Sequence, residues 1–135
     1  MSVNFCQQCG HAMEICAIDG REVPVCPACG FTAWRNPVVA TMVVIETPGG
    51  LILGRRSIEP GYGLWCLPGG FVNEEEAPAE AAARECLEEI RANVTIDSLL
   101  DVYHIVRGDG RGMGGIAYVA SLAQGAGPRV GHEMP

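Results

Sequence analysis

The sequence predicts a domain of the α/β (α+β) class, preceded by a small cysteine-rich module. Several short β-branched runs and one segment with helical periodicity predict the domain, and two Cys-x2-Cys pairs near the N-terminus predict the module. The chain has 135 residues, of which 48% are hydrophobic and 19% charged, so it can bury one globular core. We place the module at residues 1–36 and the domain at residues 37–135.

The cysteines of the first module have the spacing of a zinc site. Cys6 and Cys9 form one pair, Cys26 and Cys29 form the second, and sixteen residues separate the pairs. A segment of this size needs a bound metal to fold, and Asp19-Gly20 predicts a hairpin turn between the pairs. The total of seven cysteines is odd, which argues against a disulfide framework and favours a reducing, cytoplasmic setting.

The second segment alternates apolar runs with turn residues before and after one helix. Residues 78–91 are the only long helical segment, and Pro78 suits its first turn. The strands that we expect lie at 38–45, 51–53, 64–67, 94–96, 99–106 and 116–122. Residues 68–70 should stop a strand, residues 108–115 should form a glycine-rich turn, and residues 125–135 show no periodicity.

Three glutamates of the helix lie on one face. Glu85, Glu88 and Glu89 have the spacing i, i+3, i+4, and the apolar face around Cys86 lies beside them. Carboxylates at this spacing repel one another unless a divalent cation such as Mg²⁺ or Mn²⁺ binds them. A solvated acidic face is the alternative, and the spacing alone leaves both interpretations open.

The charge distribution excludes some partners. The net charge is −7, and seven of the sixteen acidic residues lie between Glu74 and Glu89. A broad basic face for nucleic acid is therefore not expected. The longest apolar run has eight residues, and the N-terminus lacks the features of a signal peptide, so we expect neither a membrane span nor secretion.

The spacing around the helix resembles the Nudix box, G-x5-E-x7-R-E-U-x-E-E-x-G-U, where U is a bulky apolar residue. The matching residues are Gly70, Glu76, Arg84, Glu85, Glu88 and Glu89. Arg91 and Ala92 depart from the final glycine and apolar positions, which puts the loop after the helix in doubt. The resemblance implies an α/β/α sandwich with a mixed sheet.

The resemblance also implies an activity, namely hydrolysis of a nucleoside diphosphate linked to another moiety. Glu85, Glu88, Glu89 and the carbonyl of Gly70 would bind Mg²⁺ or Mn²⁺, and Glu85 or Glu88 is a candidate general base. Arg84 would hold a box glutamate in place. Glu76 would be a supporting residue or an outer-shell ligand.

The cysteine module, joined to the box domain through Trp34-Arg35-Asn36-Pro37, resembles the zinc-ribbon Nudix hydrolases, which include NADH, ADP-ribose and FAD pyrophosphatases. The Ser-Gln-Pro-Trp-Pro-Phe stretch of the NADH enzymes is missing, so ADP-ribose or an FAD-like compound is the expected substrate. Arg55, Arg56 and Trp65 are candidate substrate-binding residues. The two arginines could instead be solvated charges, and the tryptophan a core residue.

A Nudix fold normally continues beyond the last strand seen here. The C-terminal part therefore appears short, and we expect either a truncated product or a homodimer whose partner covers the sheet. Two alternatives to the enzyme stay open. One is a nucleotide-sensing binding module whose zinc ribbon contacts a macromolecule, and the other is an inactive truncated paralogue.

Overall fold

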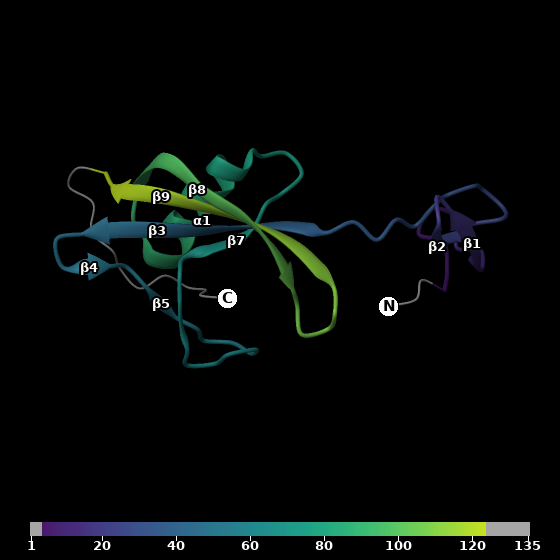
Figure 1. Ribbon diagram of the computed structural model, residues 1–135, viewed down its shortest axis with the longest axis horizontal. Coiled ribbons are helices and arrows are strands. Elements are labelled where there is room, and N and C mark those ends of the chain that lie inside the picture. The colour runs from purple at the N-terminus through teal and green to yellow at the C-terminus, as the bar shows by residue number, and fades with distance from the viewer. Residues whose placement is uncertain (1–3, 124–135) are drawn as a thin grey trace. The chain divides into compact units, whose positions relative to one another are not determined.

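The computed structural model describes residues 4–123 and divides the chain into two compact units, with the division between Asn36 and Pro37 (Figure 1). Each unit is described by itself.

A two-stranded hairpin forms the body of the first unit. Strands β1 (Glu14–Ile18) and β2 (Arg21–Val25) are antiparallel, and Ile18 pairs with Arg21 beside the turn. Asp19 and Gly20 both have positive φ, at 48° and 77°, as the two-residue turn requires. The predicted hairpin is confirmed.

Each Cys-x2-Cys pair of the first unit forms the same tight turn. The Gly10 N–H donates to the Cys6 carbonyl at 2.8 Å, and the Gly30 N–H donates to the Cys26 carbonyl at 2.9 Å. Gly10 and Gly30 have φ values of 77° and 81°, which a side chain would strain. The two turns therefore present their cysteines in equivalent ways.

A mixed sheet organises the second unit. Strands β3 (Val38–Thr47), β4 (Gly50–Leu51), β8 (Val94–Val106) and β9 (Gly112–Leu122) lie in the order β4-β3-β9-β8, and β7 (Gly69–Phe71) also pairs with β3. β3 and β9 are parallel, whereas the other pairs are antiparallel. Strands β5 (Gly54–Arg55) and β6 (Trp65–Cys66) form a separate small pair. The mixed sheet confirms the predicted fold class.

Strand β7 lies where the sequence predicts the end of a strand. Gly69 pairs with Met42, and a Cβ on Gly69 would lie 2.0 Å from the Thr41 carbonyl oxygen. Only glycine allows the two backbones to approach so closely, so residues with low β-propensity form this strand. The expectation that the chain stops pairing at Gly69-Gly70 is wrong.

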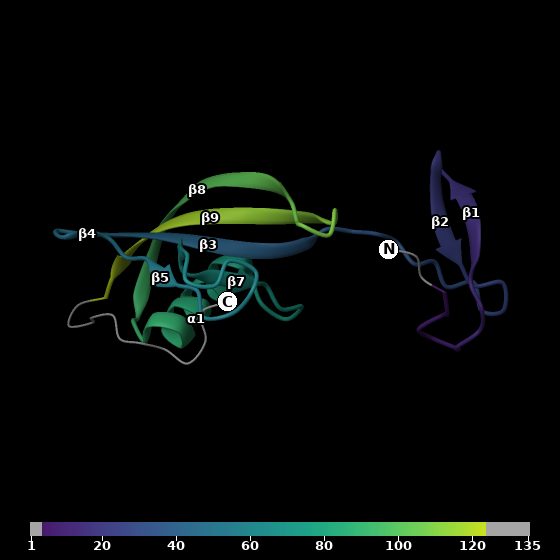
Figure 2. The same ribbon diagram turned by 90° about the horizontal axis from the view of Figure 1, so that it is seen from below.

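Strands β8 and β9 are longer than expected, and Figure 2 shows them side by side in one long hairpin. The two strands predicted at 94–96 and 99–106 are one strand, whose register shifts between Ile96 and Ser98 and between Leu99 and Asp101. Bulges absorb residues that look like a loop in the sequence. The predicted turn at 108–115 is too long, because β9 already begins at Gly112.

Helix α1 (Pro78–Ile90) packs on one face of this sheet (Figure 2). Its small side chains Ala82 and Cys86 are fully buried against Val43 and Ile45 of β3, and Ala120 of β9 joins the same core. Full burial of one Val or Ile side chain is worth about 1.5–3 kcal/mol, so this contact fixes the helix on the sheet. The carboxylate-bearing face of α1 is thereby held next to β7.

The part of the chain that the structure describes contains no helix long and apolar enough to cross a membrane. Its one helix, α1, provides one of the two helical layers of the expected sandwich. Our expectations for residues 125–135 and for the end of the fold lie outside the described residues.

Candidate active site and metal centre

Arg84 lies at the centre of a cluster of glutamates on and just before α1. Its Nε and Nη2 atoms donate to the two oxygens of Glu76 at 3.0 and 2.7 Å. Nη1 donates to Glu85 at 3.0 Å and to Glu88 at 3.2 Å, and Nη2 also donates to the Phe71 carbonyl at 3.0 Å. Arg84 thus ties the helix to β7 and to the loop before the helix.

Glu76 acts as the fixed counter-ion of this arginine. Hydrogen bonds from Arg84, and a further one from the Asn73 backbone N–H at 2.9 Å, lower the pKa of Glu76. The hydrogen bonds that Arg84 donates to Glu76 are also the chief cause of the raised pKa of Arg84. Arg84 lines the cavity described below, whereas Glu76 is not among its lining residues and supports Arg84 from outside it.

Glu89 is the one buried acidic residue among the described residues. Only 2% of it is exposed, its Oε2 accepts a 3.2 Å hydrogen bond from the Gly69 N–H, and its Oε1 has no partner among the described residues. Burial raises its pKa to about 8, and the charges of Glu85 and Glu88 add to the shift. A buried carboxylate oxygen without a partner is costly unless a cation binds it.

Glu85 lies against the glycine pair at the start of β7. A Cβ on Gly70 would lie 2.5 Å from the Glu85 carboxyl group, so any other residue there would displace that carboxyl group. Burial raises the pKa of Glu85 despite the neighbouring Arg84. The Gly70 carbonyl, a predicted metal ligand, accepts a 3.3 Å hydrogen bond from the Thr41 hydroxyl.

These residues form one wall of a cavity of about 1510 Å³ in the second unit. The wall contains Glu85, Glu88, Glu89, Arg84 and Gly70. The remaining wall includes Arg56, the loop at 57–60, and residues of the β8–β9 hairpin such as Arg107. The space is large enough for a nucleotide-sized ligand.

The carboxylate wall fits a hard divalent cation. Glu89 offers an unpartnered buried oxygen, and burial has raised the pKa of both Glu85 and Glu89. The three carboxylates do not gather as closely as the cysteines described next. Such spacing suits Mg²⁺, which is usually held by one or two carboxylates together with water and substrate phosphate.

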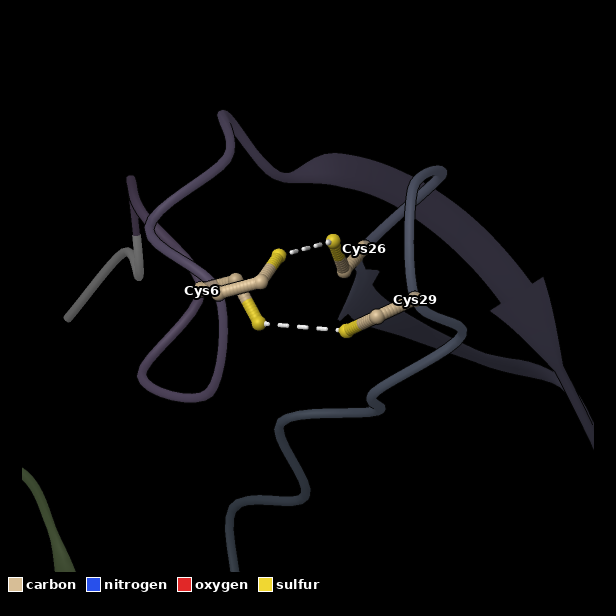
Figure 3. A group of neighbouring side chains, drawn as sticks. Cys6, Cys26 and Cys29 are labelled. Atoms are coloured by element: carbon tan, nitrogen blue, oxygen red, sulfur yellow. Dashed lines mark hydrogen bonds between the residues drawn. The ribbon is translucent and has the colours of Figure 1, made fainter.

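The sulfur atoms of the four predicted cysteines all lie within 4.8 Å of one another, and Figure 3 shows Cys6, Cys26 and Cys29 directed toward one another. The Cys6 and Cys29 sulfurs are 3.6 Å apart, and those of Cys9 and Cys26 are 3.5 Å apart. Four sulfurs at zinc–sulfur bond length in a tetrahedron lie about 3.8 Å apart, whereas a disulfide needs about 2 Å. The cluster is consistent with a zinc ribbon.

The ribbon backbone also favours the thiolate form that metals bind. Burial alone would raise the pKa of Cys26, but hydrogen bonds from the Cys29 and Ala28 N–H groups outweigh it and lower the pKa to about 6. The Gln8 N–H donates to the Cys6 sulfur at 3.4 Å in the matching turn. Each turn therefore holds one cysteine whose pKa is lowered, Cys6 or Cys26, and one whose pKa neighbouring sulfurs help to raise, Cys9 or Cys29.

A model of the NUDIX domain family matches residues 35–120, which is more than half of the chain. The chain belongs to the Nudix family. Two curated proteins are similar to parts of this chain. The Low-salt glycan biosynthesis protein Agl8 of Haloferax volcanii is 40% identical over 67 residues, which are 50% of this chain and 43% of that protein. An ADP-ribose pyrophosphatase of Methanocaldococcus jannaschii is 37% identical over 82 residues, 61% of this chain and 48% of that protein.

This Nudix chain thus spans less than half the length of those two relatives. A solved structure of a NUDIX hydrolase from Nitrosomonas europaea is similar over a larger share. It has a TM-score of 0.81 and 31% identity, and the match covers 94% of this chain and 72% of that one. The match therefore includes residues of the cysteine unit as well as the Nudix domain.

The candidate substrate residues of this Nudix protein separate into two groups. Arg56 lines the cavity, whereas Arg55 and Trp65 are not among its lining residues and pair with each other, the guanidinium 5.7 Å from the ring centre. The Nε atoms of Arg55 and Arg56 donate to the Gly63 and Pro60 carbonyls at 2.8 and 2.6 Å. Both arginines therefore brace the loop at 57–63.

Sequence reasoning missed three parts of the site. Thr41 orients the Gly70 carbonyl from β3, Phe71 accepts a hydrogen bond from Arg84, and Arg107 reaches the cavity from the β8–β9 hairpin. Thr41 and Phe71 lie on strands and Arg107 directly follows one, and only tertiary pairing brings these strands to the helix. The one local signal was Arg107 itself, a basic residue directly before a Gly-Asp-Gly turn.

Proposed function

We propose that this protein hydrolyses the pyrophosphate bond of a nucleoside diphosphate linked to another moiety, with Mg²⁺ or Mn²⁺ as cofactor. The observation that carries the proposal is the buried, unpartnered Oε1 of Glu89 in a cavity wall that also holds Glu85 and Glu88. A solvated acidic face would not bury a carboxylate to 2% exposure. This supports the metal-binding interpretation of the box over the surface interpretation.

Glu85, Glu88, Glu89 and the Gly70 carbonyl would hold the metal. Such an ion, when bound, offsets the negative charge of the phosphates and lowers the pKa of bound water. Glu88 is exposed and Glu85 is half-buried, so either can accept a proton from an attacking water. Arg84 fixes both side chains through its Nη1 atom and limits their rotation.

ADP-ribose or an FAD-like compound is the substrate that we propose, with NADH less favoured. The Methanocaldococcus jannaschii relative, which is named an ADP-ribose pyrophosphatase, supports this choice, and the cavity of about 1510 Å³ accommodates a dinucleotide-sized compound. Arg56 is the sequence-predicted candidate that faces this cavity. We propose Arg55 and Trp65 only as supports of the adjoining loop.

Product chromatography on the purified protein tests the proposal. The panel holds ADP-ribose, FAD, NADH and nucleoside triphosphates, each with Mg²⁺, Mn²⁺ or EDTA. We expect metal-dependent cleavage of ADP-ribose or FAD to a nucleoside monophosphate. Glu88→Gln and Glu89→Gln should lose at least about 10²-fold in turnover, since each removes a metal ligand or a base.

Glu80→Gln is the matched control, because Glu80 is an exposed glutamate in the first turn of the same helix. Turnover of this variant should stay close to the wild-type value. A folded protein that binds nucleotide but cleaves no substrate would contradict the enzyme and favour the binding-module alternative.

We also propose that Cys6, Cys9, Cys26 and Cys29 bind one structural Zn²⁺ and that residues 1–36 fold around it. The sulfur–sulfur distances and the lowered pKa of Cys26 support this assignment. Metal analysis of the purified protein should find one zinc per chain.

A cytoplasmic setting and a homodimer complete the proposal. None of the seven cysteines, all of which lie within the described residues, forms a disulfide, which supports a reducing setting. Exposed apolar side chains on the edge strand β8, such as Leu99, Leu100 and Val102, support a second copy as the partner. Light scattering on the purified protein tests the dimer, and a monomer at micromolar concentration would contradict it.

A further inference from the structure

Arg107 stands on a rigid support at the edge of the cavity. It follows the last residue of β8, and its N–H donates to the Arg111 carbonyl at 2.9 Å. Its own carbonyl accepts from the Gly110 N–H at 2.9 Å, and the Arg111 N–H donates to Asp109 at 3.0 Å. These bonds close the hairpin turn, so the guanidinium group extends from a fixed backbone.

The Arg107 side chain lies over the ring of Phe71 and lines the cavity. Its guanidinium carbon lies 5.6 Å from the centre of the Phe71 ring, and Arg107 lines the same cavity as Glu85 and Glu89. The ring occupies one face of the guanidinium group and leaves the N–H donors in its plane available. The Phe71 carbonyl also accepts a hydrogen bond from Arg84, so this residue of β7 contacts both arginines.

Arg107 forms no ion pair with a carboxylate among the described residues. Within residues 4–123, every ion pair closer than 4.0 Å involves Arg84, so no carboxylate of this range contacts the half-buried guanidinium of Arg107, and Asp109 interacts with its charge only from a greater distance. The other charged residues of its hairpin turn are Asp109, which accepts a hydrogen bond from the Arg111 N–H, and Arg111 itself. A stacked, half-buried cation without a counter-ion suits an anion that arrives from solution.

We propose that Arg107 binds the diphosphate of the substrate, at the phosphate farther from the carboxylate wall. The inference rests on the proposed function for the identity of the anion, a nucleoside diphosphate derivative. The carboxylates can engage phosphate only through a metal ion, because both are negative. Arg107 instead binds phosphate directly, so its contribution to affinity persists without the metal.

The test compares Arg107→Met with Arg111→Met. Both substitutions remove one positive charge from the same hairpin turn, but Arg111 is not a lining residue of the cavity. Calorimetry measures the dissociation constant of ADP-ribose, and of ADP, in EDTA. We expect Arg107→Met to weaken binding about 10- to 100-fold, as loss of a charge-assisted hydrogen bond does, and Arg111→Met to change it less than about twofold.

Kinetics with Mg²⁺ provide a second measurement. Arg107→Met should raise KM by a similar factor and change kcat little, because the contact exists before and during the reaction. Arg107→Lys should recover only part of the affinity, since lysine keeps the charge but loses the flat, stacked fork. Thermal melts establish that each variant is folded.

Three results would overturn the inference: equal weakening by both methionine variants, no weakening by Arg107→Met, or no binding of either nucleotide by the wild type in EDTA. Binding without any metal-dependent cleavage would instead contradict the proposed function and leave the role of Arg107 in place. The experiments therefore distinguish failure of the Arg107 proposal from failure of the proposed function.

Discussion

Replacing Glu89 by glutamine should make the metal-free protein more stable at high pH while it abolishes activity. The carboxyl group is buried to 2% exposure, and its pKa is raised from 4.5 to about 8. A raised pKa in the folded state means that ionisation opposes folding. The contribution of the protonated group to stability is therefore complete below pH 4.5 and is lost as the pH rises toward about 8.

The size of the effect follows from the two pKa values. Between pH 5.5 and 8.5 the free energy of unfolding of the wild type in EDTA should fall by about 3 kcal/mol through this group alone, at 1.36 kcal/mol per pKa unit. Glutamine does not ionise, so Glu89→Gln should lose much less over the same interval. Any constant cost of the buried amide cancels in this comparison of slopes.

Urea denaturation in EDTA at several pH values measures both slopes. Glu80→Gln serves as the control and should follow the wild type, because Glu80 is exposed. Mg²⁺ should restore the stability of the wild type at pH 8.5 and leave Glu89→Gln unchanged. If the wild type and Glu89→Gln lose stability equally with rising pH, Glu89 does not carry the buried charge and our reasoning about the site is wrong.

Three further predictions concern the backbone and the cysteines. Gly69→Ala should destabilise the protein by about 3 kcal/mol or more in thermal melts, because its Cβ would lie 2.0 Å from a backbone oxygen. Gly70→Ala meets only the movable Glu85 side chain, so it should keep most of the stability but lose about 10²-fold in turnover. Equal effects of the two substitutions would contradict this difference. Arg91→Gly should raise the free energy of unfolding by about 1 kcal/mol, since Arg91 ends α1 in the left-handed conformation with φ at 55°, and a lower melting temperature would refute the assignment of strain. Cys26→Ser should lose the bound zinc in metal analysis whereas Cys16→Ser, which lies outside the cluster, should keep it, and retention of zinc by both would disprove the site.

The sequence was most informative where one local pattern determines the structure. The Asp19-Gly20 turn, the helix from Pro78 and the cysteine spacing each depend on neighbours within about one turn or hairpin, and all three are found in the structure. The i, i+4 spacing likewise predicted that Glu85 and Glu89 share one face of the helix, and both line the cavity.

The opposite wall could not be predicted in this way. Arg107 reaches the cavity only because β8 and β9 form a long hairpin, and the sequence divides β8 at residues that the structure accommodates as bulges. Gly69 and Gly70 look like a loop because their pairing with β3 depends on close backbone contact rather than on side-chain preference. The position of Arg107 and the pairing of Gly69 and Gly70 thus depend on contacts between segments that are far apart in the sequence.

The parallel pairing of β3 with β9 constrains the order of events during synthesis. β9 ends at Leu122, more than seventy residues after β3, and Ala120 completes the core beneath α1. A nascent chain on the ribosome must therefore hold β3 and its apolar residues Val43 and Ile45 without their central partner until almost the whole domain has emerged. The cysteine unit, which is complete by Asn36, has no such delay. The two units therefore acquire their structure at different stages of translation.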